Sequence, residues 1–99
     1  MARFVINNKL YDTSKMDKIG SVKKWYPYQG FLLKKLYGDN VGRDYECELY
    51  CSKKGNWLLI HEECGVIVGE AISENEAKNL LLHHNYNAYL ERFEALEEA

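Results

Sequence analysis

Hydrophobic and polar positions alternate most regularly between residues 45 and 71. In the segment YECELYC, one face of an extended chain would carry Tyr45, Cys47, Leu49 and Cys51, and the other Glu46, Glu48 and Tyr50. Turns that contain glycine separate this segment from two further short apolar segments, WLLIHE and VIVGEA. The pattern predicts three antiparallel strands that follow one another as a meander over residues 45–71.

The N-terminal segment predicts a hairpin followed by a short helix. Asparagine tolerates the positive φ of a tight turn, so Asn7-Asn8 would join strands Arg3–Ile6 and Lys9–Tyr11. Asp12 or Thr13 could then cap a helix that ends at Gly20. The pattern does not decide the secondary structure of residues 21–44, because FLLKKLY fits either a helix or a strand and GDNVGRD is typical of a loop.

Two helices are expected after the meander. Ser73 and Glu76 have the spacing of a capping box, and Ala77, Leu80, Leu81 and His84 share one helical stripe. Residues 86–99 predict a second amphipathic helix that packs on the sheet. We therefore expect one α+β domain over residues 1–99, with an antiparallel sheet of four to five strands covered by the C-terminal helices.

Charge is distributed unevenly along a chain of ordinary globular composition. The net charge is −2, with 46% hydrophobic and 28% charged residues. Residues 1–35 hold eight basic and two acidic residues, whereas residues 36–99 hold five basic and thirteen acidic ones. Such asymmetry indicates either an interaction surface or the pairing of two faces within the domain.

The pattern of apolar residues and cysteines favours a cytoplasmic protein. No apolar run approaches the roughly 18 residues of a membrane span, and the first residues do not form a signal peptide. The three cysteines are an odd number and lie close together, which does not fit a disulfide framework. We expect no membrane partner.

The sequence predicts no metal site, cofactor or catalytic residue. Cys47 and Cys51 lie four residues apart on one strand, so their Cα atoms would be roughly 13 Å apart, too far for two ligands of one zinc ion. No glycine elbow or helix N-terminus activates a cysteine, and adjacent His83 and His84 should diverge on a helix, one packed and one exposed. Phosphate-binding glycine motifs are absent.

Nucleic-acid binding is suggested by the segment KKWYPYQGFLLKK, residues 23–35. Lysines neutralise phosphates and exposed aromatic rings stack on bases. Packing alone would also explain the aromatic residues, with Trp25 and Phe31 buried in the core. The residues left for a partner would be Lys23, Lys24, Tyr26, Tyr28, Lys34 and Lys35.

Three further segments, KLYDTSKMDKIG, ECELYCSKKGNWLLIHEECG and ISENEAKNLL, lie between residues 9 and 81 of the chain. They resemble a family of small proteins from phages and other mobile elements of Firmicutes. That family has a K-Y-D-T opening, an E-x-L-Y strand, a K-x-G-x-[WY] turn and a serine-led helix. The present chain departs from this pattern at HEECG and in its second C-terminal helix.

The resemblance implies a function as well as a fold. Some small proteins of such elements are anti-CRISPR inhibitors, including inhibitors of type II Cas effector nucleases, and commonly act by stoichiometric binding. We therefore expect a non-enzymatic protein that binds and inhibits a host defence protein. Acidic residues would compete for a basic nucleic-acid channel of that protein, namely Glu62, Glu63, Glu91 and Glu94. A nucleic-acid-binding module using residues 23–35 is the alternative, and a homodimeric structural protein is a third.

Overall fold

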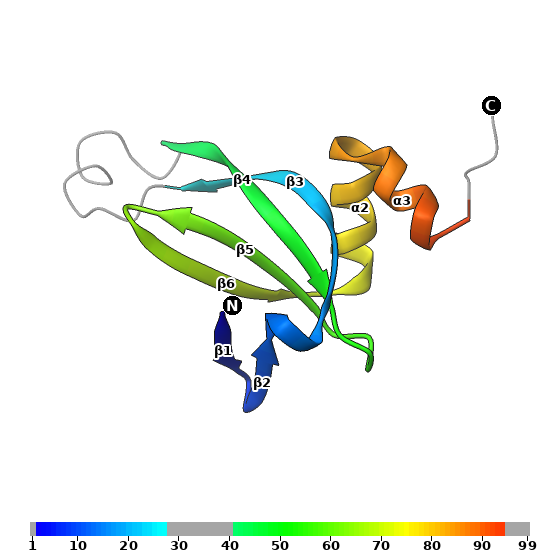
Figure 1. Ribbon diagram of the computed structural model, residues 1–99. Helices are drawn as coiled ribbons and strands as arrows, with labels where there is room; N and C mark the ends of the chain where they lie inside the picture. Colours follow the sequence, from blue (N-terminus) through cyan, green and yellow to red (C-terminus); the bar gives the residue numbers. More distant parts are fainter. Residues whose placement is uncertain (1, 28–40, 95–99) are drawn as a thin grey trace.

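A computed structural model describes residues 2–27 and 41–94. The fold is α+β, as predicted, and its elements follow the chain in a simple order (Figure 1). They are β1 (Arg3–Ile6), β2 (Lys9–Asp12), a 3₁₀ turn (Thr13–Lys15), β3 (Asp17–Pro27), β4 (Gly42–Cys51), β5 (Trp57–Glu63), β6 (Val66–Ile72), α2 (Glu74–His84) and α3 (Tyr86–Arg92).

The strands form two antiparallel sheets. The larger sheet has the order β3-β4-β5-β6, so the meander predicted for residues 45–71 is confirmed and gains β3 at its edge. The smaller sheet is the predicted hairpin of β1 and β2. Asn7 and Asn8, with φ of 52° and 63°, form its two-residue turn, because asparagine tolerates the left-handed conformation.

The larger sheet is strongly curled. Lys24 lies in the edge strand β3 and Glu70 in the opposite edge strand β6, yet their side chains are in direct contact. A flat sheet would hold these two strands roughly 14 Å apart, because neighbouring strands lie about 4.8 Å from each other. The curl gives the sheet a concave inner face, and α2 and α3 cover one half of it (Figure 1).

The hydrophobic core lies between this covered half of the sheet and the helices. Leu49 and Leu59 form a cross-strand pair and are fully buried with Leu81 of α2. Tyr89 of α3 and Trp57 of β5 close the core beside them. Of these side chains, Leu49 lies on the face that the alternation predicts to be buried, and Leu81 lies on the predicted apolar stripe of the helix.

The N-terminal hairpin covers part of the outer face of the sheet. Its Phe4 packs where Gly69 of β6 has no side chain, and a Cβ placed on Gly69 would lie only 2.7 Å from the phenyl ring. Leu58 points to this outer face and is fully buried. The outer face is therefore covered near Leu58 and Gly69.

The helix predicted after the hairpin is wrong. Asp12 does cap a turn, accepting the N–H of Ser14 at 3.0 Å, but the 3₁₀ turn ends at Lys15 and β3 begins two residues later. Gly20 does not end a helix; it lies in β3, where a Cβ would meet Asn85 at 2.8 Å. β3 continues through this position because Gly20 has no side chain and so allows the junction between α2 and α3 to pack against the strand. The predicted helix or strand at 31–37 lies outside the described residues.

At the C-terminal end, Ser73 caps α2 as predicted, accepting the N–H of Glu76 at 3.1 Å. The predicted helix over 86–99 is too long, because α3 ends at Arg92 and Phe93 is extended. Phe93 leaves the helix to pack on Trp57, with ring centroids 6.0 Å apart. Within residues 2–27 and 41–94, no helix is long and apolar enough to cross a membrane.

Candidate functional site

The paired lysines at the start of the basic–aromatic segment lie on opposite faces of β3. Lys24 and Tyr26 point into the concave inner face, whereas Lys23 and Trp25 point outward, because side chains alternate along a strand. The predicted burial of Trp25 is wrong, since this residue is 46% exposed, and Tyr26 is the partly buried one. The other residues of the predicted basic site, Tyr28, Lys34 and Lys35, lie outside the described residues, as does Phe31.

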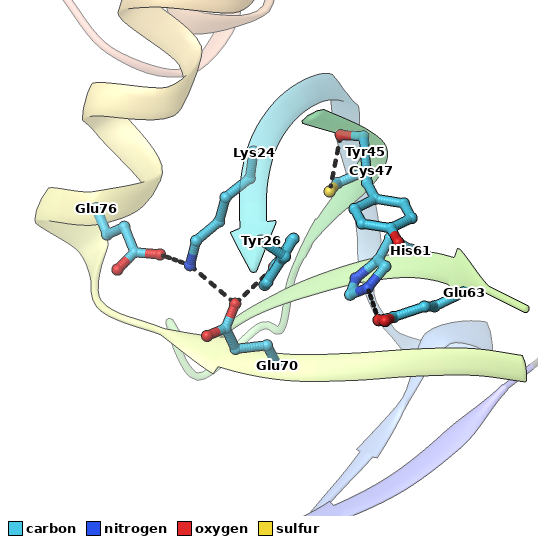
Figure 2. A network of polar contacts seen from close by, with 8 residues as sticks. All are labelled: Lys24, Tyr26, Tyr45, Cys47, His61, Glu63, Glu70 and Glu76. Atoms are coloured by element: carbon cyan, nitrogen blue, oxygen red, sulfur yellow. Dashed lines mark hydrogen bonds and ion pairs between the residues drawn. The ribbon is translucent and has the colours of Figure 1, made fainter. Parts of the chain in front are cut away.

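Lys24 is at the centre of a polar network on the inner face (Figure 2). Its Nζ lies 2.9 Å from Oε1 of Glu70 in β6 and 2.8 Å from Oε2 of Glu76 in α2. The hydroxyl of Tyr26 donates to the same Oε1 of Glu70 at 2.7 Å. The network therefore joins both edges of the sheet to the first turn of α2.

The network favours the ionised forms of Lys24 and Glu70. Burial raises the pKa of Glu70, but hydrogen bonds from Lys24 and Tyr26 outweigh this and lower the pKa overall. Burial likewise lowers the pKa of Lys24, but hydrogen bonds to Glu76 and Glu70 raise it overall. Because its charge is already paired with two carboxylates, Lys24 is poorly suited to neutralise a phosphate of nucleic acid.

A buried histidine continues the network toward β5. His61 stacks on Tyr26 with ring centroids 4.4 Å apart, and Tyr45 lies on it at 4.9 Å. Its Nε2 lies 3.2 Å from Oε2 of Glu63, while its buried Nδ1 has no hydrogen-bond partner among the described residues. We therefore assign the proton to Nε2, which donates to Glu63 and leaves Nδ1 as an unpaired acceptor. Figure 2 shows this group beside Cys47.

Burial shifts two potential nucleophiles of this face, Tyr26 and Cys47, toward their protonated forms. Burial raises the pKa of the Cys47 thiol to about 11, and burial with the Glu70 hydrogen bond raises the pKa of Tyr26. A nucleophile needs the opposite change, because only the deprotonated form attacks. The shifts favour the protonated forms of Lys24, Tyr26 and Cys47.

The candidate metal ligands are also dispersed. Cys47 and Cys51 are buried on the inner face of β4, whereas Cys64 is exposed in the turn between β5 and β6. In the part of the chain that the structure describes, no group of three or more His, Cys, Asp or Glu side chains could hold a metal ion. His83 and His84 are both exposed, so the expectation that one of them packs is wrong. The buried stripe of α2 contains Ala77 and Leu81 instead.

A different set of residues gathers on the outer face of the sheet. Asp44, Glu46 and Glu48 occupy three alternate positions of β4, and Glu62 points the same way from β5. We call these four carboxylates the acidic face. Trp25 shares the surface, because it pairs directly with Asp44 across β3 and β4.

The acidic face contains a hollow of about 220 Å³. It lies where β4 and β5 part, since their pairing ends at Glu48 and Ile60 while both strands continue (Figure 1). Glu46, Glu48 and Glu62 line it together with the aliphatic side chains of Ile60 and Ile67. Carboxylates around an aliphatic floor suit a lysine or arginine side chain, whose stem is apolar and whose head is charged.

Two lysines partly offset the charge of the acidic face. Nζ of Lys18 lies 3.2 Å from Glu48, and this bond, followed by one from Tyr50, lowers the pKa of Glu48. Lys23 stands directly opposite Glu46. Within the described part of the chain, no ion pair involves Asp44, Glu46 or Glu62, so these carboxylates remain available.

The predicted acidic residues do not form one surface. Glu62 belongs to the acidic face, but Glu63 points to the inner face and contacts His61. Glu91 and Glu94 are exposed in and just after α3, which packs on the inner face. The sequence contained the missing signal, because the alternation that buries Tyr45 and Cys47 turns Asp44, Glu46 and Glu48 together to the other side.

Comparisons with protein-family models, with curated proteins and with solved structures found no match. The function proposed below therefore rests on this chain's own geometry and on its sequence.

Proposed function

We propose that this protein is a non-enzymatic binding protein whose acidic face docks on a basic surface of a partner protein. The carrying observation is the exposed acidic face with its hollow, in which Glu46 and Glu62 have no ion pair among the described residues. A basic residue of the partner would enter the hollow, laying its stem on Ile60 and Ile67 and its charge against the carboxylates.

The exposed tryptophan beside the carboxylates favours a protein partner. Trp25 is 46% exposed and stands next to Asp44 at the edge of the acidic face. Tryptophan is enriched among the residues that dominate binding energy in protein interfaces, whereas negative charge repels nucleic acid and anionic membranes. An aromatic anchor beside an acidic hollow is suited to a basic protein surface.

The partner class follows from the chemistry of the face together with the sequence resemblance. Proteins that bind nucleic acid carry basic channels, and an acidic face can occupy such a channel in competition with phosphates. The resemblance to small mobile-element proteins suggests a host defence protein, with a Cas effector nuclease as the first partner to test. Inhibition would then be stoichiometric.

A cleavage assay with a panel of type II Cas effector nucleases tests this proposal. We expect the wild-type protein to co-purify with at least one nuclease and to stop cleavage at near-equal molar ratio. The double variant Glu46→Lys/Glu62→Lys should weaken inhibition at least about tenfold, since it reverses the charge of the hollow. Trp25→Ala should weaken it by a similar factor.

The matched control reverses two acidic residues elsewhere. Glu91→Lys/Glu94→Lys changes the net charge equally but leaves the acidic face intact. It should inhibit like the wild type; equal losses in both double variants would reduce the effect to net charge and overturn the proposed site. Failure of every nuclease to bind would remove this partner class.

Nucleic-acid binding through residues 23–35 remains the second candidate. Its support is the density of lysines in that segment, but Lys24 is already paired with Glu70 and Glu76. A gel-shift assay with labelled DNA and RNA should be repeated for Lys23→Glu/Lys34→Glu/Lys35→Glu, which spares Lys24 and its network. A salt-dependent shift that this variant loses would favour the second candidate over the first.

A further inference from the structure

A groove follows the free edge of β2 on the N-terminal hairpin. Two adjoining hollows of about 220 Å³ and 450 Å³ share Lys9, Leu10 and Asn56. The first is lined by four successive residues of β2, Lys9 to Asp12, although their side chains alternate between the faces. No residue of β1 lines either hollow. The groove therefore runs along the backbone edge of β2 that faces away from β1.

The backbone of Leu10 points into this groove. The N–H of Thr13 donates to the carbonyl of Ala2 at 3.0 Å, and in an antiparallel ladder every second residue faces the partner strand. Tyr11 and Lys9 therefore direct their backbone groups to β1, and Leu10 directs its N–H and C=O outward. Among the described residues, none pairs with these two groups.

The groove is basic and partly apolar. Lys9, Lys15 and Lys54 line it, and the side chain of Leu10 is 65% exposed. The one carboxylate of the lining, Asp12, is already bound by Ser14 and lies 3.4 Å from Nε of Arg3. The lysine charges are thus left for a partner.

We propose that this edge binds an extended, acidic segment of a partner protein, which adds to β2 as a third strand. Hydrogen bonds to the backbone of Leu10 would align the segment, as in other complexes formed by strand addition. Alternate carboxylates would contact Lys9, Lys15 and Lys54, and an apolar side chain would cover Leu10.

Single-stranded nucleic acid fits the groove less well than an acidic peptide. Bases need exposed aromatic rings to stack on, but Tyr11, the only aromatic residue lining the two described hollows, is 6% exposed. The unpaired backbone groups of Leu10 also match a peptide, which presents N–H and C=O groups at the same spacing.

One contact must change when the segment binds. Nζ of Lys9 donates to Oδ1 of Asn56 at 3.3 Å, which links the two sides of the groove. A carboxylate in the groove would replace this 3.3 Å bond to a neutral amide by a bond between opposite charges, which is typically about 2.7–2.9 Å long. The exchange favours an acidic ligand over a neutral one.

Fluorescence anisotropy with a labelled peptide of about eight alternating glutamate and valine residues tests the proposal. Lys9→Glu/Lys54→Glu should weaken binding at least about tenfold. Leu10→Pro removes the backbone N–H that points into the groove. Because this N–H makes no hydrogen bond to β1, the variant should lose binding and still keep the far-UV circular dichroism spectrum of the wild type. Leu10→Ala keeps the N–H and should weaken binding only a few-fold.

Three outcomes would overturn the proposal. They are no binding of the acidic peptide up to about 1 mM, equal binding by the lysine variant, or tighter binding of an oligothymidylate of matched charge. If Leu10→Pro unfolds the hairpin, the lysine variant and the Leu10→Ala variant still test the proposal. This groove is separate from the acidic face, so Lys9→Glu/Lys54→Glu should leave inhibition through that face unchanged.

Discussion

Lys24 is the residue through which both edges of the sheet and α2 are joined. Its side chain is 23% exposed, and its ammonium group lies within 3 Å of two carboxylates from different elements. The stem crosses the concave face beside Tyr26, whose ring centroid lies 5.2 Å from Nζ. The charged group is therefore tolerated on the inner face because each of its contacts is with an acceptor or a π-face.

Replacing this lysine should destabilise the protein in a pH-dependent way. Lys24→Met leaves Glu70 and Glu76 as neighbouring unpaired carboxylates, and we expect a loss of about 1–2 kcal/mol in the free energy of unfolding at neutral pH. The loss is smaller than for a fully buried pair because water reaches both glutamates, whose side chains are 39% and 43% exposed. Lys23→Met, on the outer face, is the matched control and should change stability little.

The sign of the pH dependence follows from Glu70. Its pKa is lowered from the ordinary 4.5, so its contribution is present above that pH and is lost as the pH falls below it. Urea denaturation at pH 7 and pH 3 should therefore show the difference between wild type and Lys24→Met shrinking in acid. A difference that stays constant would mean that the lysine stabilises through packing of its stem.

At the scale of elements, Asn85 joins α2 to α3. The residue ends α2, and its side-chain oxygen accepts the N–H of Ala88 to begin α3. Its amide group also donates to the carbonyl of Ser21 in β3 at 3.1 Å, which fixes the joint against the sheet. The chain can turn here because Gly20 has no side chain below it.

Asn85→Ala should cost about 1 kcal/mol or more, since it removes the cap of α3 and the bond to β3 together. The matched control is Asn87→Ala, an exposed position inside α3, where alanine should be neutral or slightly stabilising. Thermal unfolding followed by circular dichroism measures both. Equal effects of the two variants would show that the contacts of Asn85 contribute no net stability.

The elements were predictable where a local pattern decides them. Alternation predicted β4, a short apolar segment between turns that contain glycine predicted β5, paired asparagines predicted the hairpin, and Ser73 predicted the start of α2. The predictions failed where tertiary contacts decide the structure. Met16 to Gly20 have the spacing of a short helix, but from Asp17 on they belong to β3 at the edge of the sheet, and Gly20 leaves room for the side chain of Asn85. Likewise Phe93 leaves α3 because Trp57 offers a packing partner that no local pattern reveals.

The candidate sites were predictable only in part. The alternation in β4 was visible, but the hollow depends on where β4 and β5 part, which is a property of the assembled sheet. The network of Lys24 depends on the curl that brings β3 to β6. Neither contact is local in sequence, so the pairing of Lys24 with two carboxylates could not be predicted from the segment that contains it.

At the scale of the whole molecule, the three thiols differ in how far they are buried. Cys47 and Cys51 are 1% exposed on the inner face of β4, and burial raises the pKa of both. Cys64 is exposed in a turn. The two core thiols can react only when the sheet and helices separate, so they should follow global unfolding.

Titration with a chromogenic disulfide at pH 8 checks this expectation. One thiol should react quickly and the other two only slowly, and all three should react quickly in denaturant. Cys64→Ser should remove the fast phase and leave the slow one. Two or three fast thiols in the native protein would show that the covering helices open far more readily than their packing suggests.

The bond between Lys24 and Glu76 can form only late in the synthesis of the chain. Glu76 follows Lys24 by 52 positions, which takes a ribosome about 3 to 10 s at ordinary elongation rates. Until Glu70 is made, 46 positions after Lys24, the strand carrying Lys24 has neither of its carboxylate partners, and the lysine gains more from water than from an unfinished concave face. The nascent chain is thereby discouraged from closing around half a sheet. The end of β6 and the first turn of α2 are synthesised one directly after the other. Only when both are present does the ammonium group of Lys24 favour the folded state.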